Sequence, residues 1–88
     1  MSENNHAKML GRYIVADPKI CHGKPTFRGT RIMVWQVFEM LEDGLTLDDI
    51  VRNFPNGVPK EALAEAIRLS GAAFVKHWDD FVVEVASQ

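Results

Sequence analysis

The last third of the chain carries an apolar stripe too long for a domain of this size to cover. The stripe runs through Leu63, Ile67, Ser70, Phe74, Trp78, Phe81 and Val85. Its positions advance by three or four residues, which is the spacing of one face of an α-helix. A helix unbroken from Pro59 to Val85 would be about 40 Å long, whereas a domain of 88 residues has a radius of gyration of roughly 12 Å. The end of the stripe is therefore predicted to project beyond the core.

The projecting part of the stripe is predicted to bind a second protein surface, because exposed apolar patches of this kind usually mark interfaces. The surface could belong to a second copy, giving a homodimer, or to another protein. Gly71 lies within the stripe and could bend or interrupt the helix. Residues 75–88 are interpreted as an extension of the domain for partner or dimer contact. The candidate partner-binding residues are Phe74, Trp78, Phe81, Val82 and Val85.

Two shorter helices are predicted before the long one, because the apolar spacing takes on a helical period at Val34. Gly44 follows the first as a C-terminal cap. Thr46 begins the second as an N-terminal cap, and Pro59 opens the third in its first turn. Three helices joined by short turns form the order of a helix-turn-helix domain. The apolar positions are Val34, Val37, Phe38 and Leu41, then Leu47, Ile50, Val51 and Phe54.

The first third of the chain predicts only a small β element. Residues 1–12 have the composition of a flexible polar arm, and Tyr13–Ala16 has the β-branched and aromatic character of a strand. Short extended pieces lie on either side of a turn at Gly29. The predicted fold is therefore mainly α with a small N-terminal β element. It is a three-helix, helix-turn-helix-like domain over residues 13–74, with an extended C-terminal helix over residues 75–88.

Positive charge is concentrated at the start of the chain. Residues 1–35 carry a formal net charge of +4 and residues 36–88 one of −6. Arg28 and Arg31 flank a Gly-Thr turn, an arrangement that suits contacts with phosphate. Each arginine could instead hold the β element to an acid such as Asp17, and both roles stay open. The candidate DNA-binding residues are Lys24, Arg28, Thr30 and Arg31, with Arg52, Lys60 and Arg68 as secondary contacts.

The sequence contains no constellation typical of catalysis or of cofactor binding. Cys21 and the three histidines lack the spacing of a zinc site. Gly23-Lys24 lacks the earlier glycine and the following Ser or Thr of a phosphate-binding loop. The protein is therefore predicted not to be an enzyme and to need no metal or cofactor. The single cysteine, the polar start of the chain and the short apolar runs predict a cytoplasmic protein without a signal peptide or membrane span.

The stretch from Asp17 to Val34 resembles the signature of a bacterial family, domain of unknown function 433. The matching residues are Asp17-Pro18, Ile20, Cys21, Gly23-Lys24-Pro25, Arg28-Gly29-Thr30-Arg31-Ile32 and Val34. The similarity covers about residues 13–74. His22 stands where the family commonly has glycine, and Pro59 replaces the usual Ser or Thr cap of the third helix. The resemblance implies a VapB-like antitoxin with a helix-turn-helix domain, often encoded beside a toxin that resembles a PIN-domain ribonuclease.

Together these observations predict the antitoxin of a type II toxin–antitoxin pair. It would be a dimeric DNA-binding repressor of its own operon that also binds and neutralises a PIN-like ribonuclease toxin. Its predicted partners are operator DNA, a toxin encoded nearby and a second copy of the chain. The alternative is a protein-interaction module of helix-turn-helix shape that does not bind DNA. The neutral exposed face predicted for the third helix favours that alternative, because strong non-specific DNA binders are more basic. That face comprises Lys60, Glu61, Ala64, Glu65 and Arg68.

Overall fold

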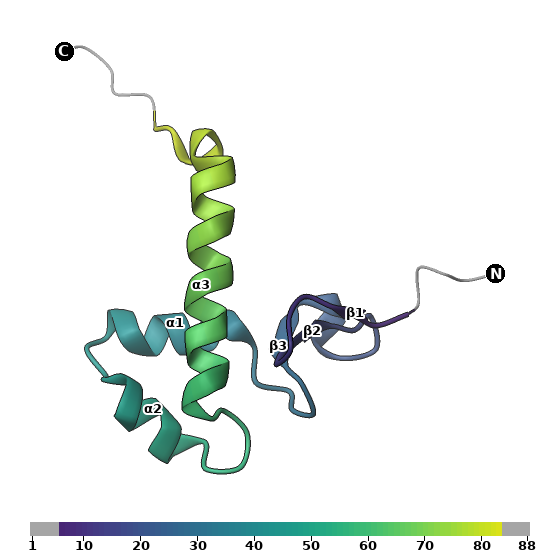
Figure 1. The fold of residues 1–88 in the computed structure, drawn as a ribbon, viewed down its shortest axis with the longest axis vertical. Helices are drawn as coiled ribbons and strands as arrows, with labels where there is room; N and C mark the ends of the chain where they lie inside the picture. The colour runs from purple at the N-terminus through teal and green to yellow at the C-terminus, as the bar shows by residue number, and fades with distance from the viewer. Residues whose placement is uncertain (1–5, 84–88) are drawn as a thin grey trace.

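Three short strands of the N-terminal third pair into an antiparallel sheet, which makes the fold α+β (Figure 1). The computed structural model describes residues 6–83. The strands are β1 (Lys8–Met9), β2 (Ile14–Ala16) and β3 (Pro25–Phe27), in the spatial order β1-β2-β3. Met9 pairs with Val15 across the first ladder, and Ile14 pairs with Phe27 across the second. The prediction of a mainly α fold is therefore wrong.

The way the sheet packs also corrects the predicted helix-turn-helix-like arrangement. β3 contacts α1 (Val34–Glu42) and β2 contacts α3 (Lys60–His77). The strands therefore form a wall of the core and are not an appendage to a helix bundle. Sequence periodicity does not reveal β1, because two residues are too few to show a period. β1 lies in the segment 1–12, which the sequence predicts to be an arm. The hairpin is closed by backbone bonding, with the Leu10 N–H donating to the Ile14 carbonyl at 2.9 Å.

The boundary between α1 and α2 (Leu47–Asn53) follows the local signals in the sequence. Gly44 has a φ of +100°, a value that favours glycine. The N–H groups of Gly44 and Leu45 donate to the carbonyls of Leu41 and Met40, each at 3.0 Å. This is the Schellman arrangement, which satisfies carbonyls that the helix end leaves free. The predicted C-terminal cap at Gly44 is confirmed.

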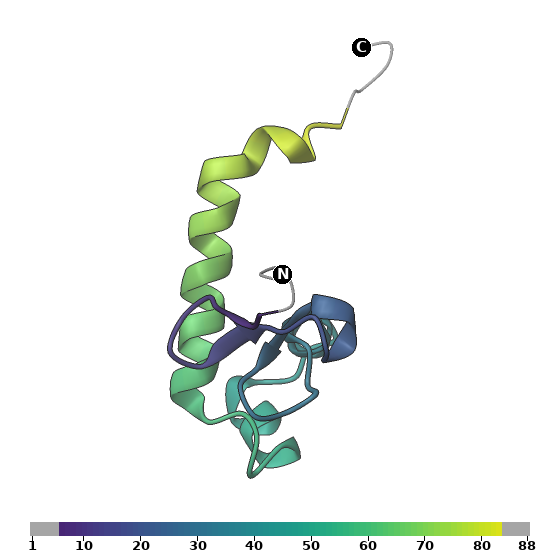
Figure 2. The ribbon, with the colours of Figure 1, turned by 90° about the vertical axis from the view of Figure 1, so that its right-hand side faces the viewer.

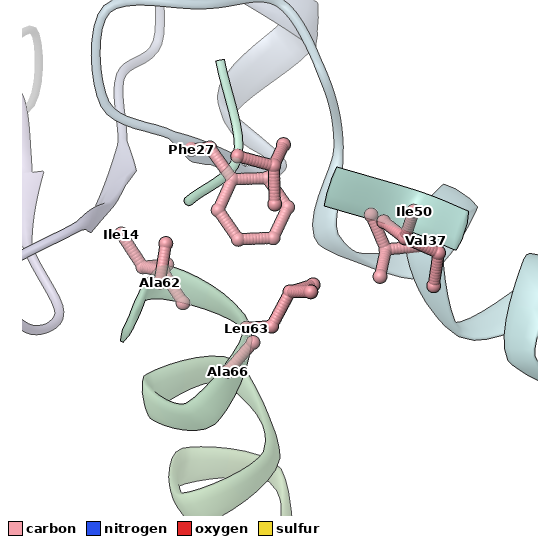
Figure 3. Packing of buried hydrophobic residues seen from close by; sticks show 8 residues of the cluster. Ile14, Phe27, Val37, Ile50, Ala62, Leu63 and Ala66 are labelled. Atoms are coloured by element: carbon pink, nitrogen blue, oxygen red, sulfur yellow. The ribbon is translucent and has the colours of Figure 1, made fainter. Parts of the chain in front are cut away.

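The core lies between the sheet and the three helices (Figure 3). Its buried side chains are Ile14, Phe27, Val37, Ile50, Val58, Ala62, Leu63 and Ala66. α3 contributes to this core only near its start, since its buried residues all lie between Ala62 and Ala66. The remainder of α3 extends past α1 and the strands, as Figures 1 and 2 show.

α3 runs without a break through Gly71 and ends at His77. A 3-10 turn, η3 (Trp78–Phe81), follows, and the backbone is extended at Val82. The helix therefore ends before Val85, which closes the predicted stripe and lies outside the described residues. Figure 2 shows η3 turning toward the side of α3 on which the strands lie. The predicted extended C-terminal helix over residues 75–88 is therefore wrong beyond His77. Of the predicted stripe, Phe74, Trp78 and Phe81 are exposed.

A left-handed turn, η2 (Cys21–Gly23), joins β2 to β3. Cys21, His22 and Gly23 have φ angles of +51°, +58° and +83°. Only glycine adopts this region without a steric cost, because a Cβ crowds the following carbonyl. The strained residue at the centre of the turn is His22, where the resembled family commonly has glycine.

Candidate functional site

The primary basic residues lie on and beside the hairpin that follows β3. Lys24, Arg28 and Arg31 are all exposed, and none of them forms a salt bridge with any residue between 6 and 83. The Arg28 N–H donates to the Tyr13 carbonyl at 2.7 Å, so the backbone at Arg28 extends the sheet while its side chain stays in solvent. We call Lys24, Arg28 and Arg31 the basic hairpin; its cations are available to an anionic partner.

Thr30 has a structural role within the same turn. Its hydroxyl donates to the Phe27 carbonyl at 2.7 Å and accepts the Ile32 N–H at 2.9 Å. The Thr30 N–H also donates to the Phe27 carbonyl, at 3.0 Å, and Gly29 has a φ of +80°. The hydroxyl predicted as a phosphate donor is thus already used to close the turn that separates Arg28 from Arg31.

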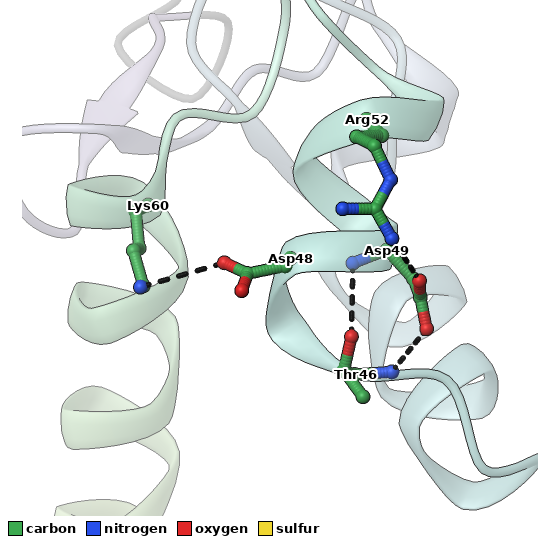
Figure 4. Close-up of polar contacts among 5 residues, drawn as sticks. All are labelled: Thr46, Asp48, Asp49, Arg52 and Lys60. Atoms are coloured by element: carbon green, nitrogen blue, oxygen red, sulfur yellow. Dashed lines mark hydrogen bonds and ion pairs between the residues drawn. The ribbon is translucent and has the colours of Figure 1, made fainter.

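The three secondary cations lie on α2 and α3 and face carboxylates. Arg52 pairs with Asp49 of its own helix, and Lys60 of α3 pairs with Asp48 of α2 at 3.4 Å (Figure 4). The third, Arg68, lies 3.7 Å from the Glu65 carboxylate. Ion pairs at the surface contribute little to stability. Their neighbouring acids nonetheless cancel the local positive charge that a phosphate would meet.

Asp49 also closes the start of α2. The Thr46 hydroxyl accepts the Asp49 N–H at 3.0 Å, and the Asp49 carboxylate accepts the Thr46 N–H at 2.8 Å (Figure 4). The bond from the Thr46 backbone is the main reason that the pKa of Asp49 lies below its ordinary value, and the Arg52 charge acts in the same direction. The predicted N-terminal cap at Thr46 is confirmed, and this cluster is structural.

Among residues 6–83, Glu65 is the buried acid, and its predicted place on an exposed face is wrong. It is 8% exposed, and its carboxylate accepts the N–H groups of Arg12 at 2.8 Å and Tyr13 at 2.6 Å. The bond from Tyr13 is the main cause that lowers the pKa of Glu65, aided by Arg12 and by the Arg68 charge, while burial opposes it. A Cβ at Gly11 would lie 2.6 Å from this carboxyl group. The loop before β2 can therefore close over Glu65 only without a side chain at that position.

An apolar groove of about 440 Å³ opens between the sheet, α1 and α3. Its floor on α3 consists mostly of small side chains, and Trp35 and Phe38 of α1 form the opposite wall. Lys24 is the only charged residue among those that line it. The lining residues are Leu10, Ile14, Lys24, Pro25, Val34, Trp35, Phe38, Ala66, Leu69, Ser70 and Ala73. Sequence periodicity could not reveal this groove, because three separate elements build it.

The groove borders directly on the apolar end of α3 and η3. Phe74 follows the lining residue Ala73, and its ring packs on that of Phe81 with centroids 5.3 Å apart. Phe74, Trp78, Phe81 and Val82 are 56–67% exposed. We call these four residues the projecting end. They are four of the five predicted partner-binding residues; the fifth, Val85, is not among the residues described.

The described residues contain no cluster of three or more His, Cys, Asp or Glu side chains arranged to hold a metal ion. Cys21 donates its thiol to the Arg31 carbonyl at 3.5 Å, so it contacts the hairpin backbone. Among the helices in residues 6–83, none combines the length and the apolar character needed to cross a bilayer. The surface features that remain are the basic hairpin, the groove and the projecting end.

These features belong to a small α+β domain. The model of the family described as protein of unknown function (DUF433) matches residues 14–69, which is more than half of the chain. The chain therefore belongs to that family. No curated protein and no solved structure matches it significantly. The matched range includes the basic hairpin and most of the groove but ends before the projecting end.

Proposed function

We propose that this protein acts by binding another protein through the projecting end, as the antitoxin of a toxin–antitoxin pair. The observation that carries the proposal is an exposed apolar surface beyond the part of α3 that packs in the core. It consists of Phe74, Trp78, Phe81 and Val82. Helices in proteins gain most of their stability from packing. A partner that covered this end would therefore stabilise it, and an amphipathic helix laid into an apolar groove is a common mode of recognition.

The proposed partner is a PIN-like ribonuclease toxin encoded nearby, because the resemblance to the family implies such a pairing. Binding would neutralise the nuclease by covering part of its surface. No catalytic group on this chain is needed for that effect. The projecting end would act by steric blocking of the nuclease, and its binding would depend on apolar contacts.

A second activity, binding of operator DNA, is proposed for the basic hairpin. Lys24, Arg28 and Arg31 are exposed and free of salt bridges within the described residues. Arg52, Lys60 and Arg68 have carboxylate partners and are assigned a lesser role. This assignment keeps the main DNA contact on the hairpin, where the sequence predicts it, and not on the third helix that a helix-turn-helix protein would use.

Co-purification with the product of the adjacent gene tests the partner-binding function. Phe74→Asp should abolish recovery of the complex, because it places a charge in the apolar contact. Ala72→Asp is the matched control, since two residues turn a helix by about 200° and place Ala72 on the other side of α3. Equal recovery with both variants would contradict binding through the projecting end.

Salt-dependent binding to DNA from upstream of the gene tests the second activity. Three cations from each subunit of a dimer would neutralise about six phosphates and give a log–log salt slope of about −5. Arg28→Ala should make the slope shallower by about two and weaken all sequences alike. If folded Arg28→Ala protein binds with unchanged affinity and slope, the hairpin is not the contact. If the parent protein binds no DNA, the alternative of a protein-interaction module is the better description.

A further inference from the structure

We infer that the apolar groove receives the α3–η3 end of a second copy of this chain, in a two-fold symmetric dimer. The groove and the projecting end are adjacent on the same molecule, and both are apolar. A two-fold axis places the same surface of both copies in contact. Each copy then fills the other's groove with its own end, and neither feature is left uncovered.

The spacing along α3 suits this exchange. The groove-lining residues of α3 lie between Ala66 and Ala73, and the apolar end from Phe74 to Phe81 spans the same number of residues. If two α3 helices cross antiparallel about an axis near Ala73, residues 74–81 of one copy lie along residues 66–73 of the other. η3 turns toward the strand side of α3 (Figure 2), which directs the end over the partner's groove.

The side chains on the two surfaces differ in size in the way that close packing requires. Ser70 and Ala73 are small and exposed, so a neighbouring helix can approach α3 to the usual interaxial distance of about 8–10 Å. The rings of Phe74 and Phe81, which pack against each other at a tilt, are large and belong to the segment that approaches. Large groups from one copy therefore meet small groups on the other.

The exposed apolar area is about what a stable dimer needs. Leu10 and Trp35 at the groove, and the four residues of the projecting end, are 44–67% exposed. With full side-chain areas near 200 Å², these six expose on the order of 700 Å². A standard interface buries about 800 Å² on each partner. The two surfaces therefore offer enough apolar area for a stable dimer. Because the dimer covers the projecting end, the toxin and the second copy would compete for it.

This inference does not depend on the toxin or on DNA, and its test uses the purified full-length chain alone. Sedimentation equilibrium should give twice the 9.9 kDa chain mass. Ala73→Glu should weaken dimerisation by at least about 100-fold, because it buries an unpaired charge at the axis. Ala64→Glu is the matched control. It adds the same charge to an exposed alanine nine residues away, which lies on the opposite face of α3, and it should leave the dimer intact.

Cross-linking provides a second readout that does not require loss of the dimer. In a Cys21→Ser background, Ala73→Cys should form a disulfide between copies under mild oxidation, and Ala64→Cys should not. A monomeric parent protein would overturn the inference and leave the toxin-binding proposal standing. A dimer equally sensitive to both glutamate variants, or cross-linked equally by both cysteine variants, would also overturn it, because the contact would then lie elsewhere.

Discussion

The Glu65 carboxylate ties the loop before β2 to α3. It accepts two backbone N–H groups, from Arg12 and Tyr13. In Glu65→Gln protein one of these donors would face an amide NH₂ group and lose its acceptor. The substitution should therefore lower the free energy of unfolding at pH 7, since an unsatisfied buried donor is costly. Urea denaturation of both proteins measures the difference.

The effect of Glu65→Gln should depend on pH in one direction. The pKa of Glu65 is lowered from its ordinary value of 4.5 in the folded protein, chiefly by the N–H of Tyr13. Its contribution is therefore fully present above pH 4.5 and is lost as the pH falls through the lower folded pKa. The stability difference between parent and variant should shrink on acidification. Glu61→Gln, a change at an exposed glutamate of the same helix, controls for the loss of one charge. If the stability difference between parent and Glu65→Gln protein does not change with pH, ionisation of Glu65 has no role.

A second prediction at the residue scale concerns the left-handed turn. His22 has a φ of +58°, and an L-residue in this region costs about 1–2 kcal/mol. His22→Gly removes that cost but increases the entropy of the unfolded chain. The net change should raise the free energy of unfolding by about 1 kcal/mol. Chemical denaturation measures this change in the free energy of unfolding. His22→Ala is the control, because it keeps the Cβ and should show no increase in stability. An equal increase in both variants would mean that the imidazole, and not the backbone angle, is the cause.

At the scale of elements, the helices and the strand at Ile14–Ala16 could be predicted, whereas β1 and the pairing of the three strands could not. The signals for α1 and α2 are local: an apolar period, Gly44 at one end and Thr46 at the next start. β1 has two residues and no period, and its strand character comes from pairing with β2. Glu65 shows the same limit within a helix. Glu65 lies on the same helical face as Ala62 and Leu69, a position compatible with burial. However, the N–H groups that donate to its carboxylate are about fifty positions away in the chain.

The candidate site also has features that could be predicted from the sequence and features that could not. The projecting end could be predicted because a helical period is visible in the sequence and the length of the stripe can be compared with the size of the domain. The exposure of Arg28 and Arg31 also agrees with expectation. The groove and the internal bonding of the Thr30 hydroxyl depend on elements that meet only in the folded chain.

A prediction at the element scale follows from the placement of the core on α3. Its buried residues end at Ala66, so truncation after Phe74 should leave the core intact. The truncated chain should unfold within about 1 kcal/mol of the monomeric Ala73→Glu variant. Its unfolding midpoint should not vary with protein concentration, whereas that of the full chain should rise with concentration. A truncated chain that fails to fold would show that the end of α3 stabilises its own subunit.

At the scale of the whole molecule, the dimer and the basic hairpin are linked through the number of phosphates bound. A dimer presents two copies of Lys24, Arg28 and Arg31 to one duplex, and a monomer presents one. The dissociated Ala73→Glu variant should therefore bind operator DNA with a log–log salt slope of about −3, compared with about −5 for the parent protein.

The control for this last prediction is Ala64→Glu, which adds the same negative charge without touching the proposed dimer contact. It should keep the slope of about −5, because the dimer stays intact. The added carboxylate repels DNA in both variants, so this repulsion cannot explain a difference between their slopes. A fluorescence anisotropy titration across a series of salt concentrations measures all three slopes. If both variants show the parent slope, the two hairpins do not act together on one duplex. If both show the same reduced slope, the added charge is the cause and the subunit count is not.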